Sequence, residues 1–254
     1  MTQVWVAFSV AWQFLTIVPL PGRGVDQPTA LTLASSLYWF PVVGVVLGMG
    51  LVGLDRLLYS FMDEGARNMI LLALLILVTG GLHQDGVADT VDALAGGRDA
   101  EHRLKILRDS HIGAIGATGL MISLGLRYAG LMALPAEVRE AALVSMPALG
   151  RWAMVVGTWR MTSPRSDGLA ASFLREMTGR HLLIATLMVM SVLIGLLGVA
   201  IAIAVVTGGF VLVRLLNGGF SKLFGGITGD LLGTVNECVE IVFLLLAPLM
   251  VSAD

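Results

Sequence analysis

Charged residues are scarce in this sequence of 254 residues. Asp, Glu, Lys and Arg make up 13% of it, about half the share that is usual in soluble domains. The 16 basic and 18 acidic side chains leave a net charge of -2, so the chain lacks the basic excess that marks a nucleic-acid-binding protein. Its single cysteine, Cys238, excludes a disulfide framework and any metal site built from several thiolates. The composition therefore excludes a soluble globular enzyme, a disordered chain and a nucleic-acid-binding module.

Hydrophobic residues, in contrast, are abundant. They make up 56% of the chain and, together with 31 glycines, about two thirds of it. A helix needs about 20 mostly apolar residues to cross a bilayer. We therefore expect one all-α membrane domain over residues 1–254, a polytopic helical bundle with about seven spanning helices and a range of six to eight. The expected spans are 26–55, 68–84, 112–134, 141–159, two within 182–213 that meet near 195–198 or 207–209, and 231–251.

The N-terminal segment 1–25 differs from these spans. Its apolar part is short, carries Trp5, Phe8 and Trp12, and ends at Pro19. Aromatic residues of this kind are typical of helices that lie in the membrane interface. We expect an interfacial or re-entrant segment, and no cleaved signal peptide because no basic region precedes the run.

Lys and Arg are distributed unevenly among the segments between spans. If 83–111 and 160–180 are loops on one side, eleven basic residues fall on that side and three on the other. Basic residues concentrate on the cytoplasmic side of membrane proteins. The distribution predicts that both loops are cytoplasmic. The eleven are Arg23, Arg98, Arg103, Lys105, Arg108, Arg160, Arg165, Arg175, Arg180, Arg214 and Lys222.

A first acidic cluster contains Asp85, Asp89 and Asp92. At about 100° per residue these positions fall within an arc of about 60° on one helix face. Like charges so close repel one another, so we expect a cationic partner there. The short apolar run before Asp85 also places the cluster at or just inside the membrane surface, where ionisable groups are usually functional.

A second acidic cluster lies near the C-terminus. Asp230, Glu237 and Glu240 fall within an arc of about 80°, and Gly233 on the same face leaves room for a ligand. Carboxylate oxygens suit Mg²⁺ or Mn²⁺ bridged to substrate phosphates, and such ions assist phosphoryl displacement. The alternative is a polar seam in which these carboxylates pair with Arg127 and Arg151, as in a transporter.

The segment 97–112 carries several cations close to acidic residues. It is either a solvated, salt-bridged amphipathic helix or an anion-binding cradle, because arginine forks match phosphate oxygens. His83 and His111 flank this segment. A histidine there is either a base or an interfacial hydrogen-bonding group, and the second interpretation is favoured.

Several separated motifs resemble those of the cobalamin synthase family, also called adenosylcobinamide-GDP ribazoletransferase. They occur in the same order as in that family and extend over nearly the whole chain. The matching segments are 14–21 (FLTIVPLP), 40–44 (FPVVG), 81–92 (GLHQDGVADTVD), 96–98 (GGR), 107–113 (LRDSHIG), Arg151, 163–169 (SPRSDGL) and 226–233 (GITGDLLG) with Glu237 and Glu240. Two positions depart from the family pattern. Ala93 stands where Gly is usual, and His111 stands where Arg is usual, which makes Arg108 the better candidate for an anion ligand.

The resemblance implies a Mg²⁺-dependent transferase of cobalamin biosynthesis in the bacterial cytoplasmic (inner) membrane. A hydroxyl of α-ribazole, or of its 5′-phosphate, attacks the corrinoid-proximal phosphorus of adenosylcobinamide-GDP, and GMP leaves. The active site would face the cytoplasm. Contact with membrane lipid is expected, a homo-oligomer is left open, and no nucleic-acid partner is expected.

The resemblance also implies roles for individual residues. Asp85, Asp89 and Asp92 would hold Mg²⁺, with Glu237 as a further ligand. Asp230, Glu237 and Glu240 would complete the metal shell or accept the proton of the attacking hydroxyl. Arg98, Arg108 and Arg151 would stabilise the phosphate charges, with Asp109 orienting one of these arginines.

Two other functions remain open at this point. A CDP-alcohol phosphotransferase also uses an acidic D-G-x-x-A helix face, but it has Arg after the Ala, where this chain has Asp89. A cation-coupled secondary transporter would use the acidic helices as cation sites and would contain inverted repeats. The glycine pairs before Asp85 and Asp230 are compatible with such a repeat.

Overall fold

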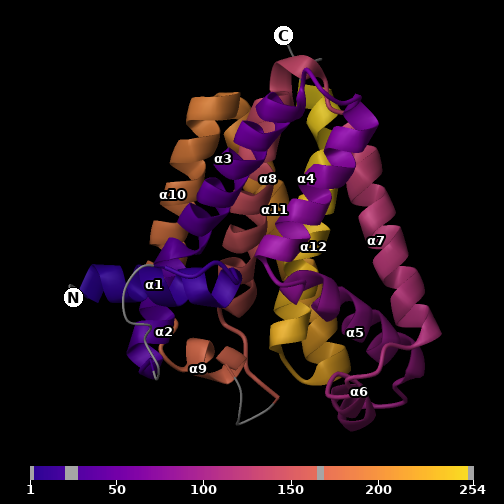
Figure 1. Cartoon of the computed structure of the whole chain (residues 1–254). Coiled ribbons are helices and arrows are strands. Elements are labelled where there is room, and N and C mark those ends of the chain that lie inside the picture. Colours follow the sequence, from indigo (N-terminus) through magenta and orange to yellow (C-terminus); the bar gives the residue numbers. More distant parts are fainter. Residues whose placement is uncertain (1–2, 21–27, 165–168, 251–254) are drawn as a thin grey trace.

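The computed structural model describes residues 3–20, 28–164 and 169–250, and every regular element in these ranges is helical (Figure 1). The predictions for Arg23 and Arg165, and part of segment 163–169, lie outside the described residues. The helices are α1 (Gln3–Leu15), α2 (Ala30–Ser36), η1 (Leu37–Trp39), α3 (Phe40–Leu58), α4 (Glu64–Val78), α5 (Leu82–Gly96), α6 (Ala100–Ile106), α7 (Ala114–Met132), α8 (Ala136–Thr158), α9 (Leu169–Arg175), α10 (Gly179–Leu197), α11 (Val199–Phe224), α12 (Gly229–Leu246) and η2 (Ala247–Met250).

Six helical segments are long and apolar enough to cross a membrane. The pair α4 and α5 would form a seventh span if it is counted as one, and the two helices meet at an angle of 88°. This confirms the prediction of a polytopic helical membrane protein with about seven spans. The long uncharged stretch 182–213 divides between α10 and α11 at Gly198, at the first of the two predicted positions.

The core of the bundle is built around α8, which packs most closely against α3. Gly44 and Gly48 of α3 lie directly on the α8 backbone, and a Cβ at Gly48 would come within 2.6 Å of the Val144 Cα. Small residues four positions apart allow two membrane helices to approach closely. Trp152 of α8 is fully buried in this core, so α8 is the element on which the other helices are arranged.

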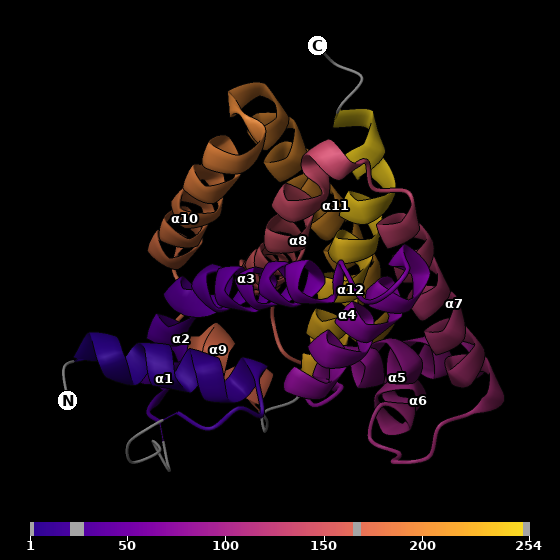
Figure 2. The same cartoon turned by 45° about the horizontal axis from the view of Figure 1, so that its top comes forward.

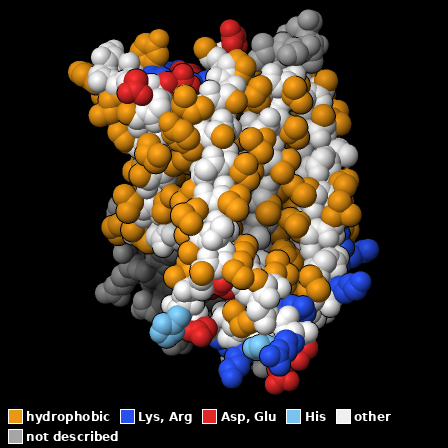
Figure 3. All heavy atoms as spheres, turned by 90° about the vertical axis from the view of Figure 1, so that its right-hand side faces the viewer, with side chains coloured by type: hydrophobic (Ala, Val, Ile, Leu, Met, Phe, Trp, Pro, Cys, Tyr) orange, Lys and Arg blue, Asp and Glu red, His pale blue; other side chains and the backbone are white. Residues whose placement is uncertain are grey.

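Charged side chains gather at the ends of the bundle. In Figure 3 most Lys, Arg, Asp, Glu and His side chains of this face lie at its lower and upper ends, with a hydrophobic zone between them. Helices α5, α6 and α9 lie at the lower end of Figure 1. Segments 83–111 and 160–180, predicted as loops, contain the helices α5, α6 and α9 in their described parts. Both segments lie at this end of the bundle.

The N-terminal helix α1 has a direction of its own. In Figures 1 and 2 it runs across the direction of α8 and α12. It is 13 residues long, which is too short to cross a bilayer. Its location in the membrane interface, or as a re-entrant segment, stays a prediction.

Candidate active site

Asp85 and Asp89 lie one turn apart on α5, at the charged end of the molecule. The helix starts after Gly80 and Gly81, whose φ angles of 63° and 70° belong to the left-handed region that glycine adopts without strain. These glycines allow the sharp bend between α4 and α5. Asp85 is exposed and Asp89 is half-buried. Within the described ranges, neither carboxylate has a hydrogen-bond or ion-pair partner.

Asp230, in the first turn of α12, lies against the same part of α5. A Cβ at Gly86 would lie 2.5 Å from the Asp230 carbonyl oxygen, so the two backbones touch at this point. The Thr234 hydroxyl donates to the Gly86 carbonyl oxygen at 2.9 Å and holds this contact. The negative charges of Asp85 and Asp230 both act on Asp89. The packing thus brings Asp230, a carboxylate of the second predicted cluster, close to the first cluster.

Asp92 has a different environment from Asp85 and Asp89. Its carboxylate oxygens accept hydrogen bonds from the backbone N–H groups of Gly113 and Gly116, each at 2.7 Å. These groups belong to the start of α7, where backbone N–H groups have no partner within the helix. Asp92 therefore caps α7 from a neighbouring helix. Its predicted role as a metal ligand stays a prediction.

The predicted metal ligands do not surround one point. Within the described residues, no three or more His, Cys, Asp or Glu side chains gather as a metal site. Mg²⁺ is usually held by one or two carboxylates together with substrate phosphates and water, without a complete protein cage. The carboxylates of Asp85 and Asp89, which lack other partners, fit this mode of binding.

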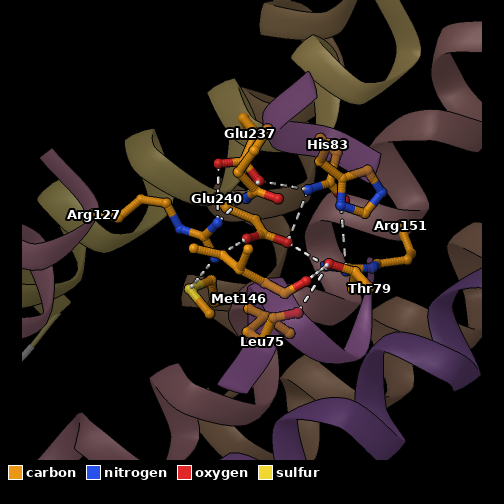
Figure 4. A network of polar contacts seen from close by, with 11 residues as sticks. Leu75, Thr79, His83, Arg127, Met146, Arg151, Glu237 and Glu240 are labelled. Carbon is orange, nitrogen blue, oxygen red and sulfur yellow. Dashed lines mark hydrogen bonds and ion pairs between the residues drawn. The ribbon is translucent and has the colours of Figure 1, made fainter. Parts of the chain in front are cut away.

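Glu237 and Glu240 lie deeper in the bundle, paired with arginines (Figure 4). Arg127 of α7 contacts Glu237 at 2.9 Å and Glu240 at 2.6 Å, and Arg151 of α8 contacts Glu240. All four side chains are at most 1% exposed. This is the pairing that the alternative interpretation of the second cluster predicted. The roles of Glu237 as a metal ligand and of Glu240 in catalysis remain predictions, and the observed partners of both are arginines.

Two residues of α5 extend this buried network toward the surface. Gln84 donates to Glu237 at 3.0 Å, and His83 Nδ1 lies 3.5 Å from Arg151 Nη2. The His83 Nε2 atom is buried and has no hydrogen-bond partner in the structure. Gly150 leaves space for the Glu240 side chain, because a Cβ at this position would come within 2.5 Å of its carboxylate. We call Arg127, Arg151, Glu237, Glu240, His83, Gln84 and Asn236 the site network.

The predicted phosphate ligands fall into two groups. Arg98 and Arg108 are exposed on the segment around α6, whereas Arg151 is buried in the site network. Asp109 accepts hydrogen bonds from the ring and backbone N–H of His111, at 2.7 and 3.0 Å, and these bonds hold the pKa of Asp109 below its usual value. The predicted contact of Asp109 with an arginine is not among its described interactions.

Two cavities meet at Asp85, which lines both. The larger, about 660 Å³, lies between the end of α1, the α4–α5 turn, α5 and the start of α7. The smaller, about 230 Å³, has mostly apolar walls with several polar groups among them. It is lined by Phe14, Leu82, His83, Asp85, Met154, Ser163, Ala170, Phe173, Thr228, Gly229, Asp230, Leu232 and Gly233. Two ligands could therefore approach the same carboxylate, one from each cavity.

Several of these residues were missed or set aside in the sequence analysis. His83 was interpreted as an interfacial hydrogen-bonding group, but it lies beneath the surface, between Arg151 and the small cavity. Its position two residues before Asp85 was the available signal. Nothing in the sequence indicated that Phe14 and Phe173, 159 positions apart, would line one cavity, because long-range packing brings them together.

The family model described as cobalamin-5-phosphate synthase matches residues 7–248. A relative from Geotalea daltonii, named adenosylcobinamide-GDP ribazoletransferase, is 36% identical over 94% of this chain and 95% of its own length. Relatives of the same name from Syntrophobacter fumaroxidans and Chlorobaculum tepidum are 33% and 36% identical, over 97% and 94% of this chain and 100% and 93% of their own lengths. No solved structure matches significantly. The chain belongs to the cobalamin-5-phosphate synthase family.

Proposed function

We propose that this protein is an adenosylcobinamide-GDP ribazoletransferase. A ribose hydroxyl of α-ribazole, or of its 5′-phosphate, attacks the corrinoid-proximal phosphorus of adenosylcobinamide-GDP. A new O–P bond forms, the bond to the GMP oxygen breaks, and the hydroxyl proton passes to a base. Family membership supports the reaction. The structural observation that carries the proposal is the pair of Asp85 and Asp89, which have no partner among the described residues, with Asp85 lining two cavities, since the reaction joins two substrates at one phosphorus.

The metal in this proposal is Mg²⁺, held by Asp85 and Asp89 together with the diphosphate of the substrate. When bound, it would neutralise charge on the diphosphate as the bond to GMP breaks. The chain supplies the rest of the site. The Asp230 carboxylate lines the small cavity with Asp85, which suits it to accept the proton of the attacking hydroxyl.

Cations near the acidic face would bind the other phosphate oxygens. The charge of Asp109 acts on Asp89, so the segment that carries Arg108 is within electrostatic reach of the acidic face. We assign Arg108 and Arg98 to the phosphates, because both are exposed on this side. Arg151 is paired with Glu240 and acts on the site through its neighbours in the network.

The proposal is tested with purified protein in liposomes that contain adenosylcobinamide-GDP, α-ribazole phosphate and Mg²⁺. We expect GMP release with formation of the cobalamin product, and loss of both with a chelator. Asp85→Asn should lower kcat at least about 100-fold, the scale of losing one charge-stabilising group in a transition state. Glu101→Gln, which changes an exposed carboxylate of α6 at the same end, is the matched control and should retain activity.

The same preparation separates the two alternative functions. Turnover of a CDP-linked lipid without any corrinoid product would replace this proposal by lipid phosphotransfer. Substrate flux into the liposomes without product would replace it by transport. Full activity of Asp85→Asn would contradict the assignment of Asp85 as a metal ligand. It would not contradict the proposed reaction.

We further propose that the protein lies in the bacterial cytoplasmic membrane with α5, α6 and α9 on the cytoplasmic side. The excess of Lys and Arg at this end supports this orientation. In a Cys238→Ala background, Glu101→Cys should react with an impermeant maleimide in inverted vesicles only. Asp63→Cys, at the opposite end, should react in right-side-out vesicles only. The reverse pattern would overturn the orientation.

A further inference from the structure

The small cavity lies between α1, α5, α8, α9 and α12. Its walls are mainly apolar and include the rings of Phe14 and Phe173, whose centroids lie 5.2 Å apart in an edge-to-face arrangement. Its volume of about 230 Å³ is below the roughly 300–1,000 Å³ of pockets that enclose whole drug-sized ligands. It is therefore suited to a compact apolar ring system that forms part of a larger ligand.

One buried polar group of this cavity has no partner among the residues that the structure describes. His83 is 1% exposed, and within that part of the chain its Nε2 atom has no hydrogen bond. A buried polar atom without a partner costs free energy unless a ligand or water satisfies it. Figure 4 shows this ring nitrogen directed away from Arg151, and His83 is among the residues that line the cavity.

The site network determines which hydrogen His83 offers. An arginine side chain can only donate hydrogen bonds, so the Nδ1 atom that contacts Arg151 must be the acceptor. A neutral imidazole with an acceptor at Nδ1 carries its hydrogen on Nε2. Arg151 is itself held by Glu240, and Glu240 by Arg127. The contact with Arg151 therefore leaves the Nε2–H as the free donor of a side chain that lines the cavity.

We propose that the small cavity binds the aromatic base of the α-ribazole substrate and that His83 recognises it. This inference rests on the proposed function. The base is a benzimidazole, a flat apolar bicycle with one ring nitrogen joined to the ribose and the other free to accept a hydrogen bond. The aromatic walls contact the ring faces, and His83 Nε2–H donates to the free nitrogen. The ribose then lies toward Asp85 and Asp230, which line the same cavity.

The larger cavity that Asp85 also lines is left for the second substrate. Its volume of about 660 Å³ lies within the range for a bulky ligand. The two substrates would thus meet at the carboxylate that lines both cavities. His83 is a base-binding residue in this arrangement, and Arg151 is a positioning residue that acts through it.

The test compares α-ribazole with an analogue in which carbon replaces the free ring nitrogen, giving an indole base. Wild-type protein should prefer the natural base at least about tenfold in kcat/KM, because the analogue leaves His83 without its acceptor. His83→Phe should reduce this preference to less than about twofold and leave the KM for adenosylcobinamide-GDP within about twofold. An unchanged preference in the variant would overturn the assignment, as would a rise only in the KM for adenosylcobinamide-GDP.

A second variant tests the cavity without touching the network. Gly229 lines the cavity, and a Cβ there would meet no atom within 4 Å, so Gly229→Leu adds bulk at the cavity wall without a backbone clash. It should raise the KM for α-ribazole more than about tenfold. Gly218→Leu is the matched control, since its Cβ also meets no atom and it lies on α11 away from the cavity. An α-ribazole KM unchanged by Gly229→Leu would overturn the proposal.

These outcomes are separable from failure of the proposed function. Absence of turnover by the wild-type protein would contradict the function. Equilibrium dialysis of α-ribazole against wild-type and Gly229→Leu protein would then still test the cavity. Binding that is weakened at least about tenfold by the variant supports the assignment, and absent or unaltered binding overturns it.

Discussion

Two buried networks of arginines and carboxylates lie at different levels of the bundle. The site network lies beneath α5, whereas the second, which we call the far network, joins Asp55 of α3, Glu64 and Arg67 of α4 and Arg139 of α8 at the opposite end. Arg139 contacts Asp55 at 2.8 Å, and Arg67 lies 3.7 Å from the same Asp55 carboxylate. Each network contains two arginines and two carboxylates, so each is electrically balanced.

The two networks differ in their access to water and in what lies beside them. The ion pairs of the site network are at most 1% exposed, while the Glu64 side chain is 44% exposed. Arg139 also donates to Asn68 at 2.6 Å, and the Arg67 guanidinium lies over the Tyr59 ring. The far network thus joins three helices near the surface. The site network contacts His83, which lines the small cavity, so similar ion pairs stand in two different surroundings.

The strongest test of this difference is Glu240→Ala. It leaves Arg127 and Arg151 without a shared acceptor in a fully buried position. Removing one partner of a buried ion pair costs about 3–5 kcal/mol, so we expect a large fall in the unfolding midpoint in detergent and loss of activity. Cys238→Ala, two residues earlier on α12, is the control and should behave like the wild type. A folded and active Glu240→Ala protein would show that the site network does not organise the site.

Asp55→Ala makes the corresponding change in the far network. Arg139 keeps Glu64 and Asn68 as acceptors, so we expect a smaller loss of about 1–3 kcal/mol. The KM values for both substrates should stay unchanged, because no cavity beside Asp85 includes far-network residues. Thermal unfolding and steady-state kinetics check both expectations, with Glu137→Gln as the exposed-carboxylate control. A changed KM would mean that the two ends are coupled.

Asp92→Asn tests whether the Asp92 carboxylate, which lies close to the site, serves only to cap α7. The amide retains one acceptor oxygen for α7, so we expect a loss of about 1 kcal/mol, as for other helix caps. The Mg²⁺ concentration for half-maximal activity should stay within about twofold of the wild-type value, whereas Asp85→Asn should shift it upward at least about tenfold. An equal shift in both variants would assign Asp92 to the metal, as the sequence analysis predicted.

The smallest effect is expected at the exposed pair of Arg56 and Glu140. Both guanidinium-to-carboxylate hydrogen bonds are short, at 2.5 and 2.6 Å, yet the side chains are 68% and 51% exposed. Exposed ion pairs contribute little because water and salt screen them. Arg56→Gln should leave the unfolding midpoint and the kinetics unchanged at physiological salt. A midpoint shift as large as that of Asp55→Ala would show that burial does not explain the difference between the networks.

Much of the fold could be predicted from composition and periodicity. The number of spans and the break at Gly198 follow from where apolar runs begin and end. The shared face of Asp85 and Asp89 follows from helix geometry. These features depend on neighbours in the sequence and on the solvent, so no tertiary contact is needed to predict them.

The roles of individual carboxylates could not be separated in this way. Asp85, Asp92 and Glu237 all appear in the sequence as acids on helix faces. In the structure one has no partner among the described residues, one caps α7 and one pairs with Arg127, 110 positions away in the sequence. Which acid remains open to a metal depends on which helices pack against it.

Composition, helical periodicity and the order of motifs were thus sufficient for the architecture and for the acidic face. Only the packing of α5, α7, α8 and α12 decided that Glu237 and Glu240 would be buried ion-pair partners and that His83 would line a cavity. The physical reason is the range of the forces involved. Helix formation and membrane insertion are set by local backbone hydrogen bonds and hydrophobicity, whereas a buried charge requires a partner that the fold brings from a distant part of the chain.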